Sequence, residues 1–322
     1  MSNELQISEE QFRAYGIFHP YALGKTLEAQ RRNQRFVYYT SADTAMRILR
    51  NGEIWMRKSH LMNDYREVEH GFDGLNESYK KNKQRMQAVF DGMFPGFCER
   101  LEAIFNSWLP HFRMDSYITC LSEHDPSEDQ HGRLSMWRAY GGGAGVALVV
   151  NGGPLLRPSN ALRANTSPVA YFHNGQVEDA LAQILSNVED NRDFLQSLGD
   201  QQVQANMFAA LRYAILCTKH PGFHEEREWR VIYSPRFARS ERITSSIESI
   251  NGIPQSICRL PLRDFPEEGL YGLAPSDFVE RVIIGPTKFP AGIYDAFAVL
   301  LADVGIPNPE QRIIFSAVPL RQ

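Results

Sequence analysis

A short charged run that leads straight into an apolar strand is the strongest constraint in this sequence. Residues 223–233 read Phe-His-Glu-Glu-Arg-Glu-Trp-Arg-Val-Ile-Tyr. Side chains alternate faces along a strand, which predicts Glu226, Glu228 and Arg230 on one strand face, about 7 Å apart from pair to pair. Charged groups enter an interior in pairs or for chemistry. The run therefore predicts either a buried acid site or a Glu/Arg ladder that closes the end of a sheet.

Composition limits the classes of protein that this chain can be. Of the 322 residues 43% are hydrophobic, which is enough for a sizeable core. With a net charge of -4, the chain lacks the overall positive charge that would attract duplex nucleic acid or an anionic membrane. The four cysteines are far apart and form no CxxC pair, so they predict buried thiols in a reducing compartment. With no signal peptide and no run of about 18 apolar residues, we expect a cytoplasmic protein.

The pattern of elements predicts two regions. Residues 1–33 are expected to form an N-terminal helical appendage, because Ser8 and Gln11 make a capping-box pattern and Pro20 opens a second helix. Residues 34–322 are expected to form a single α+β domain of catalytic type. Helical periodicity predicts two insertions in it, at 74–113 and 174–218. Strands are expected at 35–40, 53–57, 116–122, 145–150, 168–172, 226–233, 256–262, 279–285 and 312–316.

Two groups of metal-binding residue types need consideration. The acidic loop at 123–129 fits a metal site or a solvated connection. His220 and His224 have the spacing of a helical zinc pair, but Pro221 and Gly222 between them oppose a helix. We therefore expect no bound metal.

Six short motifs in order resemble the bacterial family catalogued as domain of unknown function 2971. The resemblance extends from about Phe36 to Arg321. Its motifs are Tyr38-Tyr39-Thr40 with Ile48-Leu49-x-x-Gly52, Leu61-Met62-Asn63-Asp64, Tyr117-Ile-Thr-Cys-Leu-Ser122, Met136-Trp137-x-x-Tyr140, Glu226-x-Glu228-Trp229-Arg230 and Ile283-Ile284-Gly285-Pro286. The chain departs from the family at Leu121, where Phe is more usual, and at Tyr65, where Pro often follows Asn-Asp.

The layout of these motifs is also similar to that of ADP-ribosyltransferases. The shared features are an opening strand with an aromatic residue and a Thr, a helix ending in Gly, a central strand bearing a Ser, and a late strand with Glu-x-Glu. This likeness implies an α+β fold with a split mixed β-sheet core and inserted helical hairpins. It implies an enzyme that cleaves the nicotinamide–ribose bond of NAD and transfers ADP-ribose. NAD would be a substrate, and no metal would be needed.

The likeness also implies roles for individual residues. Glu228 would stabilise the charge that develops on the ribose, and Glu226 would orient or deprotonate the acceptor. The expected NAD contacts are Tyr38 and Thr40 on the adenosine ribose, Ser122 on the nicotinamide side, Trp137 or Tyr140 stacked on a ring, and Asn63, Asp64 and Arg230 near the ligand. Which of Tyr38 and Tyr39 faces the site stays open. The family pattern differs here, because many transferases have His or Arg where this chain has Tyr38 and Thr40.

Other functions remain as alternatives. One is an NAD glycohydrolase with water as the acceptor, another is a metal-dependent nuclease that uses the acids at 123–129, and a third is a non-catalytic nucleotide- or partner-binding module. For the transferase, the acceptor is a macromolecule, either protein or nucleic acid. The resemblance implies a bacterial toxin or phage-defence effector. An antitoxin or neighbouring regulatory protein would be the partner of such an effector, and no membrane association is expected.

Overall fold

A branched mixed β-sheet organises the fold. The computed structural model describes residues 8–62, 66–250 and 252–319. In this part of the chain, strands follow the order β12-β11-β4-β1-β3-β2-β10-β9, while β8 joins β3 and β5 joins β8. Only β11 and β12 run parallel within this sheet. The strands are β1 (Arg35–Ser41), β2 (Glu53–Lys58), β3 (Tyr117–His124), β4 (Ala144–Val150), β5 (Ala164–Pro168), β8 (Glu228–Tyr233), β9 (Thr244–Ile250), β10 (Ile253–Pro261), β11 (Val279–Thr287) and β12 (Ile313–Phe315).

The sheet forks at β3. One edge of β3 pairs with β8 along its length, from Tyr117 to Ser122. The opposite edge pairs with β1 at residues 122–124 and with β2 at residues 117–118. Among the described strands, neither β1 nor β2 pairs with residues 119–121, so these two strands diverge there. The expected α+β class and mixed sheet are confirmed, and the fork leaves space in the middle of the sheet.

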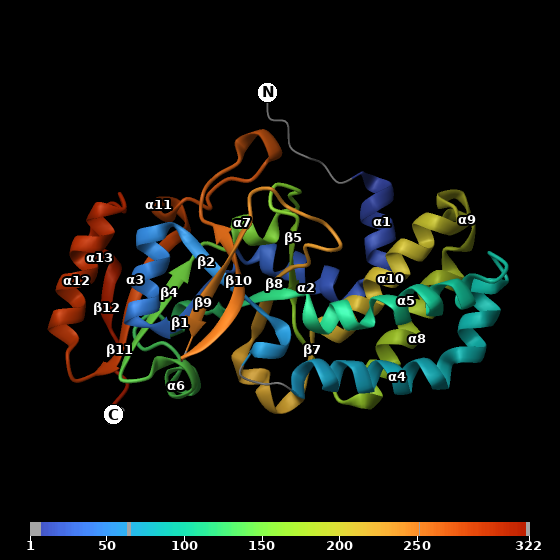
Figure 1. Ribbon diagram of the computed structural model, residues 1–322, viewed down its shortest axis with the longest axis horizontal. Helices are drawn as coiled ribbons and strands as arrows, with labels where there is room; N and C mark the ends of the chain where they lie inside the picture. Colours follow the sequence, from blue (N-terminus) through green and yellow to red (C-terminus); the bar gives the residue numbers. More distant parts are fainter. Residues whose placement is uncertain (1–7, 63–65, 251, 320–322) are drawn as a thin grey trace.

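Two groups of helices flank the sheet at opposite ends of the molecule. Figure 1 shows α1, α4, α5, α8, α9 and α10 at one end and α3, α12 and α13 at the other. The longer helices are α1 (Glu9–Phe18), α2 (Pro20–Arg31), α3 (Ala42–Asn51), α4 (Arg66–Met86), α5 (Phe97–Met114), α8 (Asn174–Asp190), α9 (Arg192–Leu198), α10 (Asp200–Leu216) and α12 (Pro290–Asp303). The short ones are α6 (Leu134–Met136), α7 (Gly153–Leu156), α11 (Pro275–Phe278) and α13 (Pro309–Arg312).

Several short elements connect these helices and strands. Two strands of two residues each, β6 and β7, pair in parallel in a small separate sheet. The short elements are η1 (Ser59–Leu61), η2 (Gln87–Asp91), η3 (Pro126–Glu128), η4 (Trp137–Gly141), β6 (Ala170–Tyr171), β7 (Thr218–Lys219), η5 (Pro221–Glu226) and η6 (Pro266–Glu268). Of these, η2 and η4 are π-helical and the other η elements are 3₁₀-helical.

Each face of β8 contributes to a different core. Trp229, Val231 and Tyr233 pack into the core that includes residues of α3 and α12. Ile232 packs into the core that includes residues of α4, α5, α8 and α10. This is the alternation expected of a strand with both faces covered. Consequently the charged side chains at the start of β8 lie inside the molecule and not on its surface.

Local sequence signals predicted many element boundaries. Ser8 and Gln11 form the expected capping box at α1, and the Ser41 hydroxyl accepts a hydrogen bond from Thr44 N at 3.2 Å to cap α3. The expected strand at 168–172 is instead broken into β5 and β6, and β9 occupies residues expected to form a loop. No described helix has the length and apolar character needed to span a bilayer.

Candidate functional site

A cavity of about 640 Å³ lies where the sheet forks. Its volume falls within the range of small-molecule sites, and two further cavities among the described residues measure about 440 and 290 Å³. It brings together six of the expected site residues, Tyr38, Thr40, Ser122, Tyr140, Glu226 and Glu228. The rest of its wall includes Tyr39, Arg47, Trp55, Arg57, Thr119, Cys120, Lys219 and Phe223. These residues include members of five strands, β1, β2, β3, β7 and β8, so distant parts of the sequence converge on one space.

Strand alternation divides the cavity wall into two groups. Register places Ser122 opposite both Glu228 and Val37, so these side chains share a sheet face. Tyr39, two residues after Val37, lies on that same face. Tyr38 and Thr40 lie on the opposite face. Both tyrosines thus reach the cavity, from opposite faces of β1.

The two tyrosines differ in their partners. The Tyr39 ring packs edge-on against Trp137, with the ring centroids 4.9 Å apart, and its hydroxyl accepts a hydrogen bond from Arg133 N at 2.7 Å. Burial raises the pKa of Tyr38, and the hydrogen bond with Thr119 and the Arg57 charge oppose this shift only in part. Burial also raises the pKa of Tyr39, to about 12. Both hydroxyls therefore stay protonated at neutral pH, and Tyr38 can donate a hydrogen bond to a ligand.

Glu228 is a buried carboxylate held by two cations. Its side chain is 6% exposed. Oε1 accepts from Arg230 Nε at 2.7 Å, and Oε2 accepts from Lys219 Nζ at 3.1 Å. Burial alone would raise the pKa of Glu228, but the charges of Arg230 and Lys219 outweigh it and lower the pKa to about 2. Glu228 is consequently ionised across the physiological range and can accept hydrogen bonds.

Lys219 is the principal residue of the site that sequence reasoning missed. It is buried on β7, and its Nζ also donates to Glu226 Oε2 at 2.5 Å. The ammonium group lies 4.7 Å from the centre of the Phe223 ring. No motif spacing predicts this arrangement. The only signal in the sequence is a lone lysine seven and nine residues before two carboxylates.

The expected position of Glu226 on a strand face is wrong. Residues 221–226 form the 3₁₀-helix η5, and Arg227 adopts a left-handed conformation (φ 43°) before β8 begins at Glu228. Glu226 still reaches the cavity, because the turn brings its carboxylate to Lys219. Arg133 Nη1 donates to the carbonyl oxygens of Glu225 at 2.7 Å and Glu226 at 3.3 Å, which fixes this turn. The two acids are therefore joined by a buried cation, not by strand periodicity.

Tyr140 and Ser122 complete this side of the cavity. The Tyr140 hydroxyl donates to Glu226 Oε1 at 3.4 Å. Burial and the Glu226 charge raise the pKa of Tyr140, so its hydroxyl is protonated. Ser122 is buried directly across the β3–β8 ladder from Glu228. A ligand on this side would meet two carboxylates, an ammonium group and two hydroxyls.

Two expected ligand contacts lie outside the cavity wall. Trp137 is 1% exposed, and its Nε1 donates to His131 O at 2.7 Å. Arg230 is also 1% exposed, and its Nη1 donates to Leu216 O at 2.5 Å while Nε holds Glu228. Trp137 therefore has a packing role and Arg230 supports Glu228 from behind. Asn63 and Asp64 lie outside the described residues.

The opposite side of the cavity is basic and aromatic. The Arg47 guanidinium lies 4.7 Å from the centre of the Trp55 ring. Arg57 Nε donates to Gln255 Oε1 at 3.0 Å. Planar guanidinium groups suit phosphate recognition, and an indole face suits a stacked base. Acids thus line one side of the cavity, and arginines line the other.

The acidic loop after β3 is engaged by arginines. Arg227 pairs with Asp125 at 3.0 Å, and Arg133 pairs with Glu128 at 3.1 Å. Asp129 forms ion pairs with Arg35 and Arg281, both at 2.9 Å. Within the described ranges, no group of three or more His, Cys, Asp or Glu side chains is arranged to hold a metal ion.

The stability contributed by Glu228 should depend on pH. A carboxyl whose folded-state pKa is lowered, here from 4.5 to about 2, stabilises the fold above its unfolded pKa. This contribution is lost as the pH falls from about 5 through 2. Across this window we expect the unfolding free energy of the wild type to fall by on the order of 3 kcal/mol more than that of Glu228→Gln. Urea unfolding at a series of pH values measures the difference, and equal pH slopes would contradict this role of Glu228.

Trp137→Ala should lower the free energy of unfolding by about 3–5 kcal/mol, because it removes a fully buried ring. The ring has room only because residue 285 is glycine, since a Cβ at this position would lie 2.8 Å from the ring. Urea denaturation measures the loss, and Tyr140→Phe, which removes only a hydroxyl, is the control. A loss below about 1 kcal/mol would show that Trp137 is not a packing anchor.

One family model matches part of the chain. Residues 136–231 match the family described as Protein of unknown function (DUF2971), which confirms the family resemblance for this segment. The segment contains Tyr140, Lys219, Glu226 and Glu228, so it carries the acidic side of the cavity. No curated protein and no solved structure gives a significant match.

Proposed function

We propose that this chain, whose residues 136–231 match the DUF2971 family, is an NAD-dependent mono-ADP-ribosyltransferase that acts on a macromolecular acceptor. The observation that carries the proposal is the cavity in the forked sheet, where an ionised, buried Glu228 lies beside Glu226 and across the fork from Tyr38 and Arg57. A dinucleotide needs a carboxylate near its reacting ribose and polar or cationic groups along its phosphates. Both occur in this one space.

The groups around Glu228 suit stabilisation of a developing positive charge. An ionised carboxylate can accept a hydrogen bond from a ribose hydroxyl and stabilise a cationic sugar as the nicotinamide bond breaks. Lys219 and Arg230 hold Glu228 in place, so little reorganisation is needed during the reaction. Burial strengthens the electrostatic effect, because water screens charges less inside the cavity.

Glu226 is the residue proposed to act on the acceptor. Its side chain is 16% exposed against 6% for Glu228, so it is the more accessible of the two acids. It is bound by Lys219 and Tyr140. From this position Glu226 can orient an acceptor nucleophile or take its proton. We further propose that the protein acts as a bacterial toxin or defence effector in the cytoplasm.

The test is incubation of the purified protein with labelled NAD and cell lysate. Label recovered in protein or nucleic acid identifies the acceptor class, and label recovered only as free ADP-ribose indicates the glycohydrolase alternative. Chelator should leave the reaction unchanged, whereas a metal-dependent nuclease would lose its activity. Absence of transfer, of hydrolysis and of stabilisation by NAD would overturn the proposal.

A specific observation favours the non-catalytic binding module as the second candidate. Both oxygens of Glu228 already accept hydrogen bonds from cations, as in a structural ion-pair network. In this case NAD would bind without turnover, or another nucleotide would bind in its place. Turnover by the wild type separates the two functions, whereas loss of stability in a Glu228 variant does not, because both predict it.

A further inference from the structure

The strand β5 has one edge that no described strand pairs with. Its residues Ala164–Pro168 pair with β8 in antiparallel register, from Ala164 opposite Tyr233 to Pro168 opposite Trp229. The sheet ends there on this branch. An unpaired strand edge presents backbone donors and acceptors that can pair with another chain.

The register identifies which backbone groups point outward. Val169 N donates to Glu228 O at 2.9 Å, in the same register as the β5–β8 ladder. Backbone groups alternate direction along an antiparallel strand, so the N–H and C=O groups of Asn165 and Ser167 point towards β8. The N–H and C=O groups of Ala164 and Thr166 therefore point away from the sheet. Among the described residues, none donates to or accepts from these four groups.

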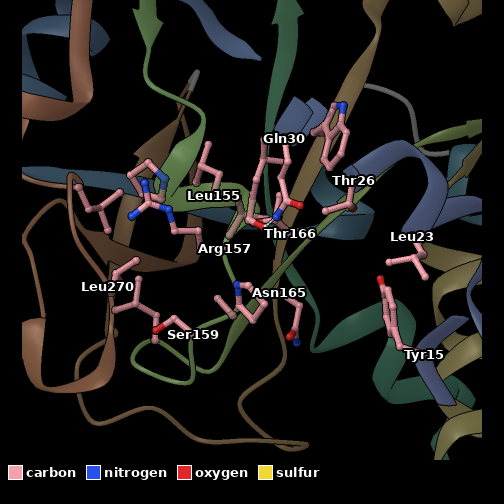
Figure 2. A pocket seen from close by; sticks show the side chains of 18 of the residues that line it. Tyr15, Leu23, Thr26, Gln30, Leu155, Arg157, Ser159, Asn165, Thr166 and Leu270 are labelled. Carbon is pink, nitrogen blue, oxygen red and sulfur yellow. Dashed lines mark hydrogen bonds between the residues drawn. The ribbon is translucent and has the colours of Figure 1, made fainter. Parts of the chain in front are cut away.

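A cavity of about 290 Å³ lies along this open edge. Figure 2 shows Asn165 and Thr166 at its centre, with Tyr15 and Leu23 on one side and Ser159 and Leu270 on the other. The wall is mainly apolar. It includes Phe12 and Leu27, large side chains that are 45% and 38% exposed. Helices α1 and α2 thus shield part of the edge but leave an apolar recess beside it.

We propose that this recess receives an extended peptide segment of a partner protein, which adds to β5 as a further strand. The peptide backbone would pair with Ala164 and Thr166, and an apolar side chain of the peptide would enter the recess. Strand addition of this kind combines main-chain hydrogen bonds with pockets for alternate side chains. Residues of α1, α2 and the segment 154–159 wall the recess, which favours a single extended chain over the sheet edge of a second copy.

Charge indicates the composition of the partner segment. Arg157 in the wall and Arg163 just before β5 are both exposed. Arg163 lies near Glu268, and its charge helps to lower the pKa of that carboxyl, whereas Arg157 has no ion pair within 4 Å in the part of the chain that the structure describes. The chain as a whole carries a net charge of -4, so the positive charge of Arg157 at the recess is a local feature. The partner segment should therefore combine alternating apolar residues with an acidic one.

The position of β5 connects this edge to the cavity in the forked sheet. Ser167 of β5 lies opposite Arg230, and Arg230 holds Glu228. A strand added to β5 would extend this branch of the sheet and support β5 where it pairs with β8. The docking itself does not depend on NAD chemistry, so its test and the transferase test can fail independently.

Thr166→Pro is the decisive variant. Proline removes the outward N–H and blocks strand addition, yet it leaves the β5–β8 hydrogen bonds in place because the Thr166 N–H does not take part in them. Thr166→Val keeps the N–H and is the matched control. Both variants should keep the far-ultraviolet circular dichroism spectrum of the wild type.

The probe is a displayed library of random nine-residue peptides, selected on the full-length wild-type chain. Enriched peptides are then synthesised with a fluorophore and measured by anisotropy. We expect alternating apolar residues with an acidic residue, and binding that Thr166→Pro weakens at least about tenfold. Thr166→Val should bind within about twofold. Methylation of alternate peptide nitrogens should weaken binding in one register and not in the other.

Several outcomes would overturn the proposal. They are a library that yields no binder, a peptide that binds Thr166→Pro as tightly as wild type, and slow hydrogen exchange of the Ala164 and Thr166 amides in the free chain. A dimer detected by sedimentation that Thr166→Pro dissociates would also overturn it, because a second copy would then occupy the edge.

Discussion

Glu228→Gln is expected to lower the turnover of NAD about a hundredfold, which corresponds to about 3 kcal/mol of transition-state stabilisation. Glutamine keeps the shape of the side chain and removes its negative charge. The remaining amide oxygen replaces only one of the two carboxylate oxygens that accept from Arg230 and Lys219, and the neutral amide stabilises a developing cation far less. NAD binding should change less than turnover, because the lost interaction is strongest in the transition state.

This variant must be assayed with the folded fraction known. Glu228 is paired with two buried cations, so its replacement should also reduce stability. Turnover is therefore measured at low temperature, after circular dichroism shows that the variant is folded. Glu189→Gln is the matched control, because Glu189 is also paired with an arginine, Arg85 at 2.7 Å, but lies on α8 outside the cavity. Full turnover in folded Glu228→Gln would contradict the assigned role.

The strands that build the cavity were predictable because their signals are local. β-Branched and aromatic residues mark β1 and β3, and these strands then deliver Tyr38, Thr40 and Ser122 to the fork. Ser41 caps α3 as its position before the helix predicts. Such features depend on a few neighbouring residues, and tertiary packing did not override them.

The features that were not predictable depend on contacts between distant parts of the chain. Alternation placed Glu226 on a strand, but Arg133, 93 residues away, holds the turn in which Glu226 lies. Lys219 follows an apolar helix and carries no motif. Trp137 belongs to a recognisable motif, yet a motif does not reveal whether a ring faces a cavity or a core. In β9, polar residues outnumber apolar ones, and pairing with β10 makes the segment a strand.

The acids and the arginines lie on different sides of the cavity, and this separation would orient a bound ligand. Glu226 and Glu228 lie on the side that includes Lys219, whereas Arg47 and Arg57 come from α3 and β2. A ligand with an anionic middle and an electron-poor ring would be oriented by this charge separation alone. The fork of the sheet is what permits it, because a continuous sheet would place a strand where the ligand is proposed to lie.

Lys219→Met is expected to lower the free energy of unfolding by about 3–5 kcal/mol. Methionine has a similar length but no charge. The substitution leaves Glu226 without its strongest partner and leaves two carboxylates facing one another inside the cavity. Arg230 continues to hold Glu228, which keeps the loss below that of removing both cations.

The loss of unfolding free energy in Lys219→Met should depend on pH and on the burial of the two carboxylates. Repulsion between the two acids raises a carboxyl pKa in the variant, and protonation of that carboxyl then relieves the repulsion. The difference between variant and wild type should therefore shrink as the pH falls from 7 towards 4. Lys81→Met is the matched control, because Lys81 also bridges two carboxylates, Glu77 at 3.2 Å and Glu178 at 2.8 Å, but on the exposed surface.

Urea unfolding of the three proteins at pH 7 and pH 4 measures both effects. Lys81→Met should change the unfolding free energy little, because exposed ion pairs contribute little to stability. If Lys219→Met and Lys81→Met cost the same, burial of the Glu226–Lys219–Glu228 cluster would have no energetic consequence. Glu228 would then not be an ionised carboxylate held in the cavity by buried cations.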